Sequence, residues 1–553
     1  MVHSTPFFTP DTDDADLPVR QRYKGTSCRF FARWLFPGWM ILVLGCGAVC
    51  PLGAQGLNPQ EKETESDLAG AVWQFGKTGA DSESNGYYFL QYSPNGRYLA
   101  ARNRDNFVEI HDVKRRVQLC EIGGHESRIL RVEFSPDSEF FVTSAPGVGE
   151  KTKVWETQTG ALATTLPVDT LSARFSTDGK QLIVLGERDV HRFEWPGGKK
   201  LASRSWGNDA DQPMAISRDG QLVASYRSIK NQTYQCQVSD VQNDSQVMLD
   251  GPTFQPRSIL ISENRQWLAA VFVRDSKVCL WNLHDPHQLK FRLEGHDDTV
   301  QSIAFSADNR FLVSTSWDKT SIVWDLLTRE PIKRIKGHTE YVNSSAFSPV
   351  GLQLATGASG KSDSSVIVWE LSDFLFPVEP RPVTAESFDQ SWRELGSAFA
   401  DKALNAVNDL RHSMSEIGPH LVDRVGTLNS MVSLDQLQAW LSDLDDPKFS
   451  VREKATLLLQ KSRGPADALL QEALRKTTSA EVRYRISRIL RTEVTRPKIS
   501  LTELRRLHRS VFLLELVNDA MSRDLLQAIA TQHPHIDIAR DAAAAVKRLE
   551  ASQ

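Results

Sequence analysis

The sequence is poor in cysteine and has no strong excess of either charge. Its six cysteines, at positions 28, 46, 50, 120, 236 and 279 of 553 residues, are too scattered for the disulfide framework of a small secreted domain. A formal net charge of −4 gives no general attraction to nucleic acid, since dedicated DNA- and RNA-binding domains usually carry a basic face. A hydrophobic content of 40% with 24% charged residues indicates a globular protein, and the length predicts two or three domains.

The sequence also lacks the short motifs that indicate catalysis. It has no His-Glu-x-x-His zinc motif, no Gly-x-Ser-x-Gly nucleophile elbow and no paired Cys-x-x-Cys. The stretches 71–78 and 355–362 match the letters of a phosphate loop, but neither leads into a helix whose N-terminal N–H groups would bind phosphate. The sequence therefore predicts no catalytic residue, no cofactor and no metal site.

Long apolar runs are absent except for one near the N-terminus. Residues 34–50 read WLFPGWMILVLGCGAVC without a charge, and arginines and lysines precede them between positions 20 and 33. Because this run is short for a bilayer span, we predict a signal peptide over 34–54. The residues before it, 1–33, are predicted to be a disordered basic leader. An uncleaved N-terminal anchor and a lipoprotein processed at Cys46 are the alternatives. All three place the body outside the cytoplasm, in the periplasm or cell envelope, with membrane association through 34–50 only.

A short motif recurs seven times through the middle of the chain. Each copy has an apolar residue, a serine and a turn-forming triplet, as in YSPNG at 92–96 and FSTDG at 175–179. The serines stand 41 to 45 residues apart, at positions 93, 135, 176, 217, 262, 306 and 348. This spacing is typical of a four-stranded propeller blade, and an apolar strand follows each turn.

A second motif keeps the same period. Partway through each repeat an apolar strand ends in a Trp-Asp pair or a variant of it, such as Trp324-Asp325. Gly-His pairs stand before three of the copies, at 124/125, 295/296 and 337/338. The chain here resembles the WD-repeat family, most clearly in GHDDTVQSIAFSADNRFLVSTSWDKTSIVWDL at 295–326. The resemblance implies a mainly β fold, a seven-bladed WD-repeat β-propeller over 71–375.

The WD-repeat resemblance also implies a buried, hydrogen-bonded tetrad inside a well-formed blade. An indole N–H, an imidazole and a hydroxyl are tolerated there only when they bond one another, with an aspartate closing the chain. The implied tetrads of the sixth and seventh repeats are His296, Ser314, Asp318, Trp324 and His338, Thr356, Asp363, Trp369. The second repeat has His125 and Trp155 but Gly149 at the aspartate position, and the third to fifth repeats lack the Gly-His pair. We expect those blades to be looser.

The two ends of the repeat region are complementary. The seventh repeat ends at SVIVWEL, residues 365–371, and lacks a fourth strand. The apolar segment AVWQF at 71–75 stands alone before the first repeat. We therefore predict that 71–75 completes the seventh blade and closes the ring, which removes the open sheet edges.

The apolar spacing changes from period two to helical across a proline-containing linker at 376–391. An all-α, HEAT-like domain is predicted over 392–550, because DDPKFSVREKATLLLQ at 445–460 resembles HEAT-type repeats. One apolar helical face is expected to include Trp392, Leu395, Phe399, Ala403, Leu404 and Val407. The order of leader, propeller and helical tail is similar to a group of exported bacterial WD proteins, which implies binding rather than catalysis.

The resulting hypothesis is a non-catalytic protein-protein interaction scaffold of the cell envelope, which binds a protein or peptide through the propeller face, the helical tail or both. In WD propellers the residue before each turn aspartate lies around the channel mouth. Arginine and tryptophan dominate binding hot spots, so such residues are candidates for partner binding. They are Arg104, Arg188, Arg274, Trp317 and Ser362. The alternatives are an enzyme with a dispersed active site in the propeller channel and a structural or sensory envelope component.

Overall fold

The structure is a computed structural model that describes residues 70–551 except 79–85, 104–105, 146–149, 170, 207–210, 230–232, 284–290, 427–433, 463–465, 467–468, 471–472, 475–476, 478, 492–499 and 534–535. The leader over 1–33 and the signal peptide over 34–54 lie outside the described residues. In the part that is described, no helix is both long enough and apolar enough to span a membrane.

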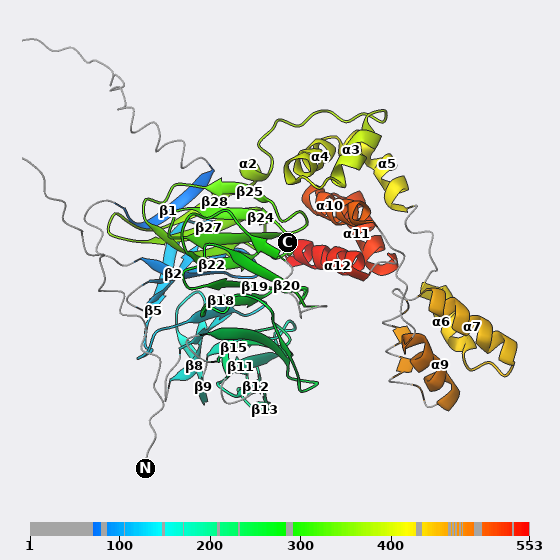
Figure 1. Cartoon of the computed structure of the whole chain (residues 1–553), viewed down its shortest axis with the longest axis horizontal. Coiled ribbons are helices and arrows are strands. Elements are labelled where there is room, and N and C mark those ends of the chain that lie inside the picture. The colour runs from blue at the N-terminus through cyan, green and yellow to red at the C-terminus, as the bar shows by residue number, and fades with distance from the viewer. Residues whose placement is uncertain are drawn as a thin grey trace, which may run out of the picture. The chain divides into compact units, whose positions relative to one another are not determined.

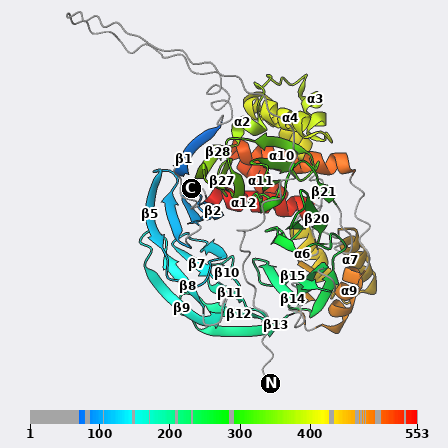
Figure 2. The same ribbon diagram turned by 60° about the vertical axis from the view of Figure 1, so that its left-hand side comes forward.

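Seven four-stranded antiparallel sheets follow one another along the chain (Figure 1). The second view shows them arranged as blades around a ring (Figure 2). The predicted seven-bladed β-propeller is therefore confirmed. In each blade the first strand is the innermost, and six of the blades take their four strands from consecutive sequence.

The strands of blades one to four share this order from inner to outer. They are β2 (Tyr87–Tyr92), β3 (Tyr98–Asn103), β4 (Val108–Asp112), β5 (Val117–Ile122); β6 (Arg131–Phe134), β7 (Phe140–Ser144), β8 (Lys151–Glu156), β9 (Leu162–Asp169); β10 (Ser172–Phe175), β11 (Gln181–Leu185), β12 (Asp189–Glu194), β13 (Lys200–Ser205); and β14 (Asp211–Ile216), β15 (Leu222–Ser228), β16 (Tyr234–Asp240), β17 (Ser245–Met248).

Blades five and six follow the same order, and blade seven takes its outer strand from the start of the described chain. Their strands are β18 (Pro256–Ile261), β19 (Trp267–Phe272), β20 (Val278–Asn282), β21 (Phe291–Leu293); β22 (Val300–Phe305), β23 (Phe311–Ser316), β24 (Ser321–Asp325), β25 (Pro331–Ile335); and β26 (Tyr341–Phe347), β27 (Gln353–Ser359), β28 (Asp363–Glu370), β1 (Ala71–Thr78).

The recurring serine motif forms the turn between the first and second strands of each blade. In blade one, Ser93 Oγ donates to Asn95 Oδ1 at 2.7 Å and accepts from the Tyr98 N–H at 2.9 Å. The same serine bonds the turn Asp or Asn in blades two to six. In blade seven, Ser348 Oγ donates to the carbonyl of Val350. These local bonds explain why serine and a short polar residue recur with the period of a blade.

The ring closes as predicted. β1 pairs antiparallel with β28, from Ala71 opposite Trp369 to Thr78 opposite Asp363. The first described strand of the chain thus supplies the missing fourth strand of the last blade. β28 is therefore paired on both sides, and β1 becomes the outer strand of blade seven.

The propeller has two faces. The loop face carries the connections between blades and the turns between second and third strands. The hairpin face carries the turns between first and second and between third and fourth strands, including the serine motifs.

The helices after the propeller pack in two separate hydrophobic clusters. One cluster contains side chains of α3, α4, α5, α10, α11 and α12 and continues into blades six and seven. The other contains side chains of α6, α7 and α9. The helices are α2 (Ser372–Leu375), α3 (Phe388–Leu395), α4 (Ala400–His412), α5 (Met414–Gly426), α6 (Leu434–Asp443), α7 (Phe449–Lys461), α9 (Ala480–Arg491), α10 (Leu501–Val517), α11 (Ala520–Gln532) and α12 (Ile536–Ala551).

The expected single apolar face from Trp392 to Val407 is wrong. The chain breaks at Gly396 into α3 and α4, and Phe399 precedes α4 with 56% of its surface exposed. Glycine is a frequent helix terminator, so the helical spacing on its two sides belongs to two helices. The likeness to HEAT repeats stays a prediction.

Candidate functional site

The polar residues expected in blades six and seven lie in continuous hydrogen-bonded chains. In blade six, Trp324 Nε1 donates to Ser314 Oγ at 2.8 Å, and Ser314 Oγ lies 2.8 Å from His296 Nε2. His296 Nδ1 lies 2.8 Å from Asp318 Oδ2. The chain runs from the blade interior to the loop face, so it holds the inter-blade loop against the turn that carries the aspartate.

Blade seven repeats this arrangement. Trp369 Nε1 donates to Thr356 Oγ1 at 2.8 Å, and His338 bridges Thr356 Oγ1 at 2.9 Å and Asp363 Oδ2 at 2.9 Å. Burial raises the pKa of Asp363, but the hydrogen bond and charge of His338 outweigh it, so this pKa lies below its ordinary value. Burial also raises the pKa of Asp318, but the hydrogen bonds from His296 and Thr320 outweigh it and hold this pKa below its ordinary value.

Blade two contains a complete chain of hydrogen-bonded side chains that the sequence pattern did not predict. His125 Nδ1 lies 2.8 Å from Glu150 Oε2, while its Nε2 lies 2.8 Å from Thr143 Oγ1, which accepts from Trp155 Nε1 at 2.9 Å. Gly149 was expected at the aspartate position and lies outside the described residues. Glu150, one residue later, replaces the aspartate, because its longer side chain reaches the imidazole of His125. The expectation that this blade lacks the acidic member is therefore wrong.

Other blades form the hydrogen bonds of their buried polar side chains with different residues. In blade one, Glu109 accepts from Tyr87 at 3.1 Å, from Asn103 at 3.4 Å and from His111 Nε2 at 2.9 Å, with His111 in the place of the tryptophan. In blade five, Trp281 Nε1 donates to a backbone carbonyl at 2.8 Å. His111 and Trp281 lie at the Trp-Asp position of their repeats, but the groups that they bond carry no repeat signal, because each blade replaces the common tetrad with its own chemistry.

The residues predicted to bind a partner lie on the loop face wherever they are described. Arg188 and Arg274 are exposed in turns between second and third strands, and Trp317 is half-buried in the corresponding turn of blade six. Ser362 Oγ donates to Glu340 Oε1 at 2.7 Å. Arg104 lies outside the described residues.

Trp317 belongs to an aromatic and cationic cluster that sequence reasoning missed in part. The Tyr341 ring lies 5.5 Å from that of Trp317, and the Arg257 guanidinium lies 5.6 Å from the Trp317 ring centroid. Tyr341 is 46% exposed. Arg257 and Tyr341 come from the inner strands of blades five and seven, so the cluster joins three successive blades at the channel mouth.

A second cluster joins blades seven, one and two on the same face. The guanidinium groups of Arg102 and Arg128 lie 5.7 Å and 5.5 Å from the centroid of the Tyr88 ring. The Tyr88 hydroxyl is 2.6 Å from Ser359 Oγ. Gly86 permits this approach, since a Cβ there would lie 2.1 Å from that of Ser359.

Several cluster residues lie at irregular positions of the inner strands. The inner strands of blades one, four, five, six and seven each shift register once, near the loop face. Each shift leaves one residue out of the ladder, as a β-bulge does. The extra residues are Tyr88, Met214, Arg257, Gln301 and Asn343. A bulge has no fixed sequence signal, which is why the pattern of repeats did not reveal these positions.

Ion pairs bridge the hairpin end of the channel. Arg174 of blade three contacts Glu133 of blade two at 3.3 Å and Glu263 of blade five at 2.7 Å. Glu263 also contacts Arg218 of blade four at 3.4 Å. These charges satisfy one another across four blades, so the loop face is the more open route toward the channel.

The hairpin face of blade six is covered by the helices. Arg310, after the serine turn, contacts Glu515 of α10 at 2.8 Å and Asp541 of α12 at 3.1 Å. Arg509 of α10 contacts Asp325, at the end of β24, at 3.0 Å. A partner of blade six therefore has access to the loop face rather than to this end.

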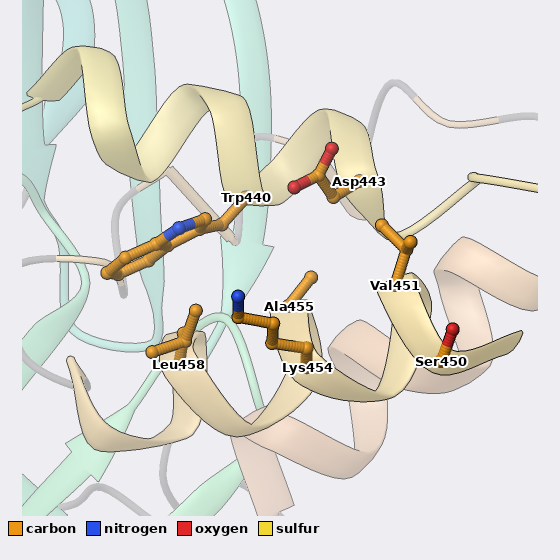
Figure 3. A pocket seen from close by; sticks show the side chains of 7 residues that line it. All are labelled: Trp440, Asp443, Ser450, Val451, Lys454, Ala455 and Leu458. Atoms are coloured by element: carbon orange, nitrogen blue, oxygen red, sulfur yellow. The ribbon is translucent and has the colours of Figure 1, made fainter. Parts of the chain in front are cut away.

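A surface pocket of about 310 Å³ lies between α6 and α7 (Figure 3). It is lined by Trp440, Asp443, Ser450, Val451, Lys454, Ala455 and Leu458. It holds one acidic and one basic side chain, and we assign no chemistry to it. Among the described residues, no group of three or more histidine, cysteine, aspartate or glutamate side chains is arranged to hold a metal ion.

Comparison with known protein families agrees with this geometry. The model of the WD domain, G-beta repeat, matches residues 116–156, 287–325 and 329–370. The chain contains WD40 repeats. The three matches include the outer part of blade one and most of blades two, six and seven, where the polar chains closed by Glu150, Asp318 and Asp363 are found.

The chain is also similar to several curated WD40 and other proteins. It is 22% identical over 301 residues to the WD repeat-containing protein 26 homolog of Arabidopsis thaliana, covering 53% of this chain and 49% of the relative. It is 24% identical over 330 residues to apoptotic protease-activating factor 1 of Rattus norvegicus, covering 52% and 25%. It is 34% identical over 123 residues to protein hir1 of Schizosaccharomyces pombe, covering 21% and 13%. The WD40 chain thus spans less than half the length of each of these eukaryotic relatives, and the exported bacterial type stays a prediction.

Proposed function

We propose that this WD40 chain is a non-catalytic interaction scaffold whose loop face binds a protein or peptide partner. WD40 propellers typically act as binding platforms, and the present repeats support the same role. The observation that carries the proposal is the contact of half-buried Trp317 with exposed Tyr341, beside Arg257 at the channel mouth. Large aromatic and arginine side chains that meet at a concave centre are the residue types that dominate binding energy.

The arrangement of charges supports the loop face over the opposite one. On the hairpin face of blade six, arginines are already paired with carboxylates of the same chain. On the loop face, the aromatic rings leave surface open to a partner. The dispersed-active-site alternative has no comparable support, because the charged groups at the hairpin end of the channel pair with one another in a structural network.

The test is affinity purification with the full chain and a double variant, Trp317→Ala with Tyr341→Ala. The matched control is Phe399→Ala, which removes an exposed aromatic ring from the helical region. We expect the dominant partner of the native chain to be lost with the double variant and retained with the control. Retention by both would contradict docking at the loop face, and turnover of a small molecule by the purified chain would favour an enzyme.

We further propose that the scaffold works outside the cytoplasm, in the periplasm or cell envelope. The proposal rests on the uncharged run at 34–50 and the basic residues before it. Fractionation of native cells should find the body of the protein outside the cytoplasm, either cleaved after the 34–54 segment or attached through it. Full-length protein confined to the cytosol would contradict export.

A further inference from the structure

Arg102 is a buried cation that forms no ion pair with a carboxylate among the described residues. Only 3% of its surface is exposed. Its Nη1 donates to the carbonyl of Asn103 at 3.4 Å, and its Nε has no acceptor among the described residues. A buried charge is normally balanced by an opposite charge, because removing an ion from water is costly.

Other buried arginines of the chain follow the normal rule. Arg310 contacts three carboxylates, Arg485 contacts two, and Arg509 contacts Asp325. The carboxylate closest to Arg102 along the neighbouring strand, that of Glu109, is already engaged by Tyr87, Asn103 and His111. Of the buried arginines that the structure describes, Arg102 is therefore the one without an ion pair.

The surroundings of Arg102 favour an incoming anion. Burial, with a smaller effect from the charge of Arg128, lowers the pKa of Arg102 to about 9, which leaves the side chain charged at neutral pH. Arg128 is exposed at the connection between blades one and two, and both guanidinium groups contact the ring of Tyr88. Two cations thus meet at one aromatic side chain, and the part of the chain that the structure describes places no ion-paired acid at Arg102.

We propose that Arg102, together with Arg128, binds a carboxylate of an acidic peptide segment of the partner protein. A guanidinium presents a fork of N–H groups that matches a carboxylate. One buried cation balances one negative charge, as an Asp or Glu side chain supplies. A nucleic acid fits less well, because the chain carries a net charge of −4 and its long-range field gives a polyanion no general attraction. The assignment rests on the proposed function, since it names the chemistry that the loop face recognises.

The test measures binding of a fluorescent octaglutamate peptide to the full chain, with octaglutamine as the neutral control peptide. Arg102→Met and Arg128→Met should each weaken octaglutamate binding by roughly ten-fold or more, the scale of a lost charge-assisted hydrogen bond. Arg115→Met is the matched control, because it removes an exposed positive charge from the hairpin face of the same blade. It should bind octaglutamate as the native chain does.

Thermal unfolding separates a binding role from a structural one. If Arg102 is retained for a ligand, Arg102→Met should unfold at or above the temperature of the native chain, since it removes an unpaired buried charge. Arg310→Met, which leaves three carboxylates behind, should unfold at a lower temperature. The exposed Arg128→Met variant keeps the binding test valid if Arg102→Met fails to fold.

Three results would overturn the assignment. They are octaglutamate binding that is unchanged in both variants, equal binding of octaglutamine, and Arg102-dependent binding of an oligothymidylate that is tighter than that of octaglutamate. If carboxylate binding at Arg102 is disproved but the Trp317 and Tyr341 double variant still loses its partner, the proposed function remains valid. If that variant also retains its partner, docking on the loop face fails as well.

Discussion

At the scale of single residues, the polar chains show how one chemical task can be done by different side chains. Glu150 reaches His125 from a position one residue later than the usual aspartate. Its other carboxylate oxygen accepts from the N–H of Ser127 at 2.7 Å, so it also fixes the loop before the inner strand. A pattern of fixed spacing cannot find such a residue, since side-chain length compensates for the shift only in three dimensions.

Replacing Glu150 tests whether it acts as the acidic member of the hydrogen-bonded chain in blade two. Glu150→Ala should lower the free energy of unfolding by about 2 kcal/mol, because His125 and the Ser127 N–H lose a buried acceptor. The control Glu139→Gln changes an exposed glutamate of the same blade and should change stability by less than about 0.5 kcal/mol. Urea unfolding measures both. Equal stability of the Glu150 variant and the native chain would show that the hydrogen bonds to Glu150 contribute nothing.

The buried chains also make stability depend on pH. Hydrogen bonds lower the pKa values of Glu150, Asp318 and Asp363 against the opposing effect of burial. Burial lowers the pKa of His125. In each case the unfolded chain binds the proton first as pH falls, so the folded state loses stability on acidification.

The expected profile has two stages. The melting temperature should be constant between about pH 7 and pH 8 and should begin to fall below about pH 6.5, where an unfolded histidine takes up its proton. A steeper loss should follow below about pH 4.5 as the carboxylates protonate. His125→Gln should flatten the first stage and keep the second, as measured by thermal unfolding across this range. A melting temperature that rises on acidification would contradict the assigned directions.

At the scale of elements, the closing strand β1 is the most consequential segment outside the repeats. Deletion of residues 71–76 should lower the melting temperature by several degrees, because β28 loses its outer partner and a ladder of backbone hydrogen bonds. Adding the synthetic peptide AVWQFGKT should restore part of the loss. An unchanged melting temperature after deletion would mean that the ring does not depend on this strand.

The elements show what a single sequence can and cannot predict. The serine turns and the third strands recur with one period, so blade number and ring closure followed from local spacing. The helices were also visible as apolar spacing, but their packing was not. Val407 and Leu513 share a cluster although they stand far apart in the sequence, while Leu459 belongs to another cluster. Such contacts depend on which faces meet after the chain turns back, and no local pattern encodes that choice.

The candidate site followed from the sequence only at positions defined by the repeat. Trp317 was found because it precedes a turn aspartate. Tyr341 and Arg257, which surround it, have no such marker. Arg102 lies inside a strand that reads as ordinary core, and its isolation is visible only when the carboxylates around it are located in space.

At the scale of the whole described body, buried arginines join the helices and the propeller, and Arg310 makes the larger set of ion pairs. Arg310 Nη1 contacts Asp308 at 3.0 Å and Glu515 at 2.8 Å, and its Nη2 contacts Asp541 at 3.1 Å. The Phe512 ring lies 4.9 Å below the guanidinium. The three acids come from a propeller turn, α10 and α12, so the side chain couples the stability of blade six to that of the helices.

Arg310→Met should uncouple the two parts. The substitution keeps most of the apolar stem but removes the cation that three buried carboxylates share, so Glu515 keeps only Arg548 and Asp541 keeps only His508 among the ion pairs of the described residues. Removing one partner of a buried pair costs about 3 to 5 kcal/mol. The matched control is Arg97→Met, because Arg97 follows the equivalent serine turn of blade one but is half-exposed and, among the described residues, pairs with the single carboxylate of Asp112. In scanning calorimetry we expect a single transition for the native chain and the control. The Arg310 variant should show an earlier transition from the helices and a later one from the propeller, because the propeller ring keeps its own closure. A single transition at the native temperature would show that the apolar contacts between Phe311 and Phe512 hold the two parts together without the charge.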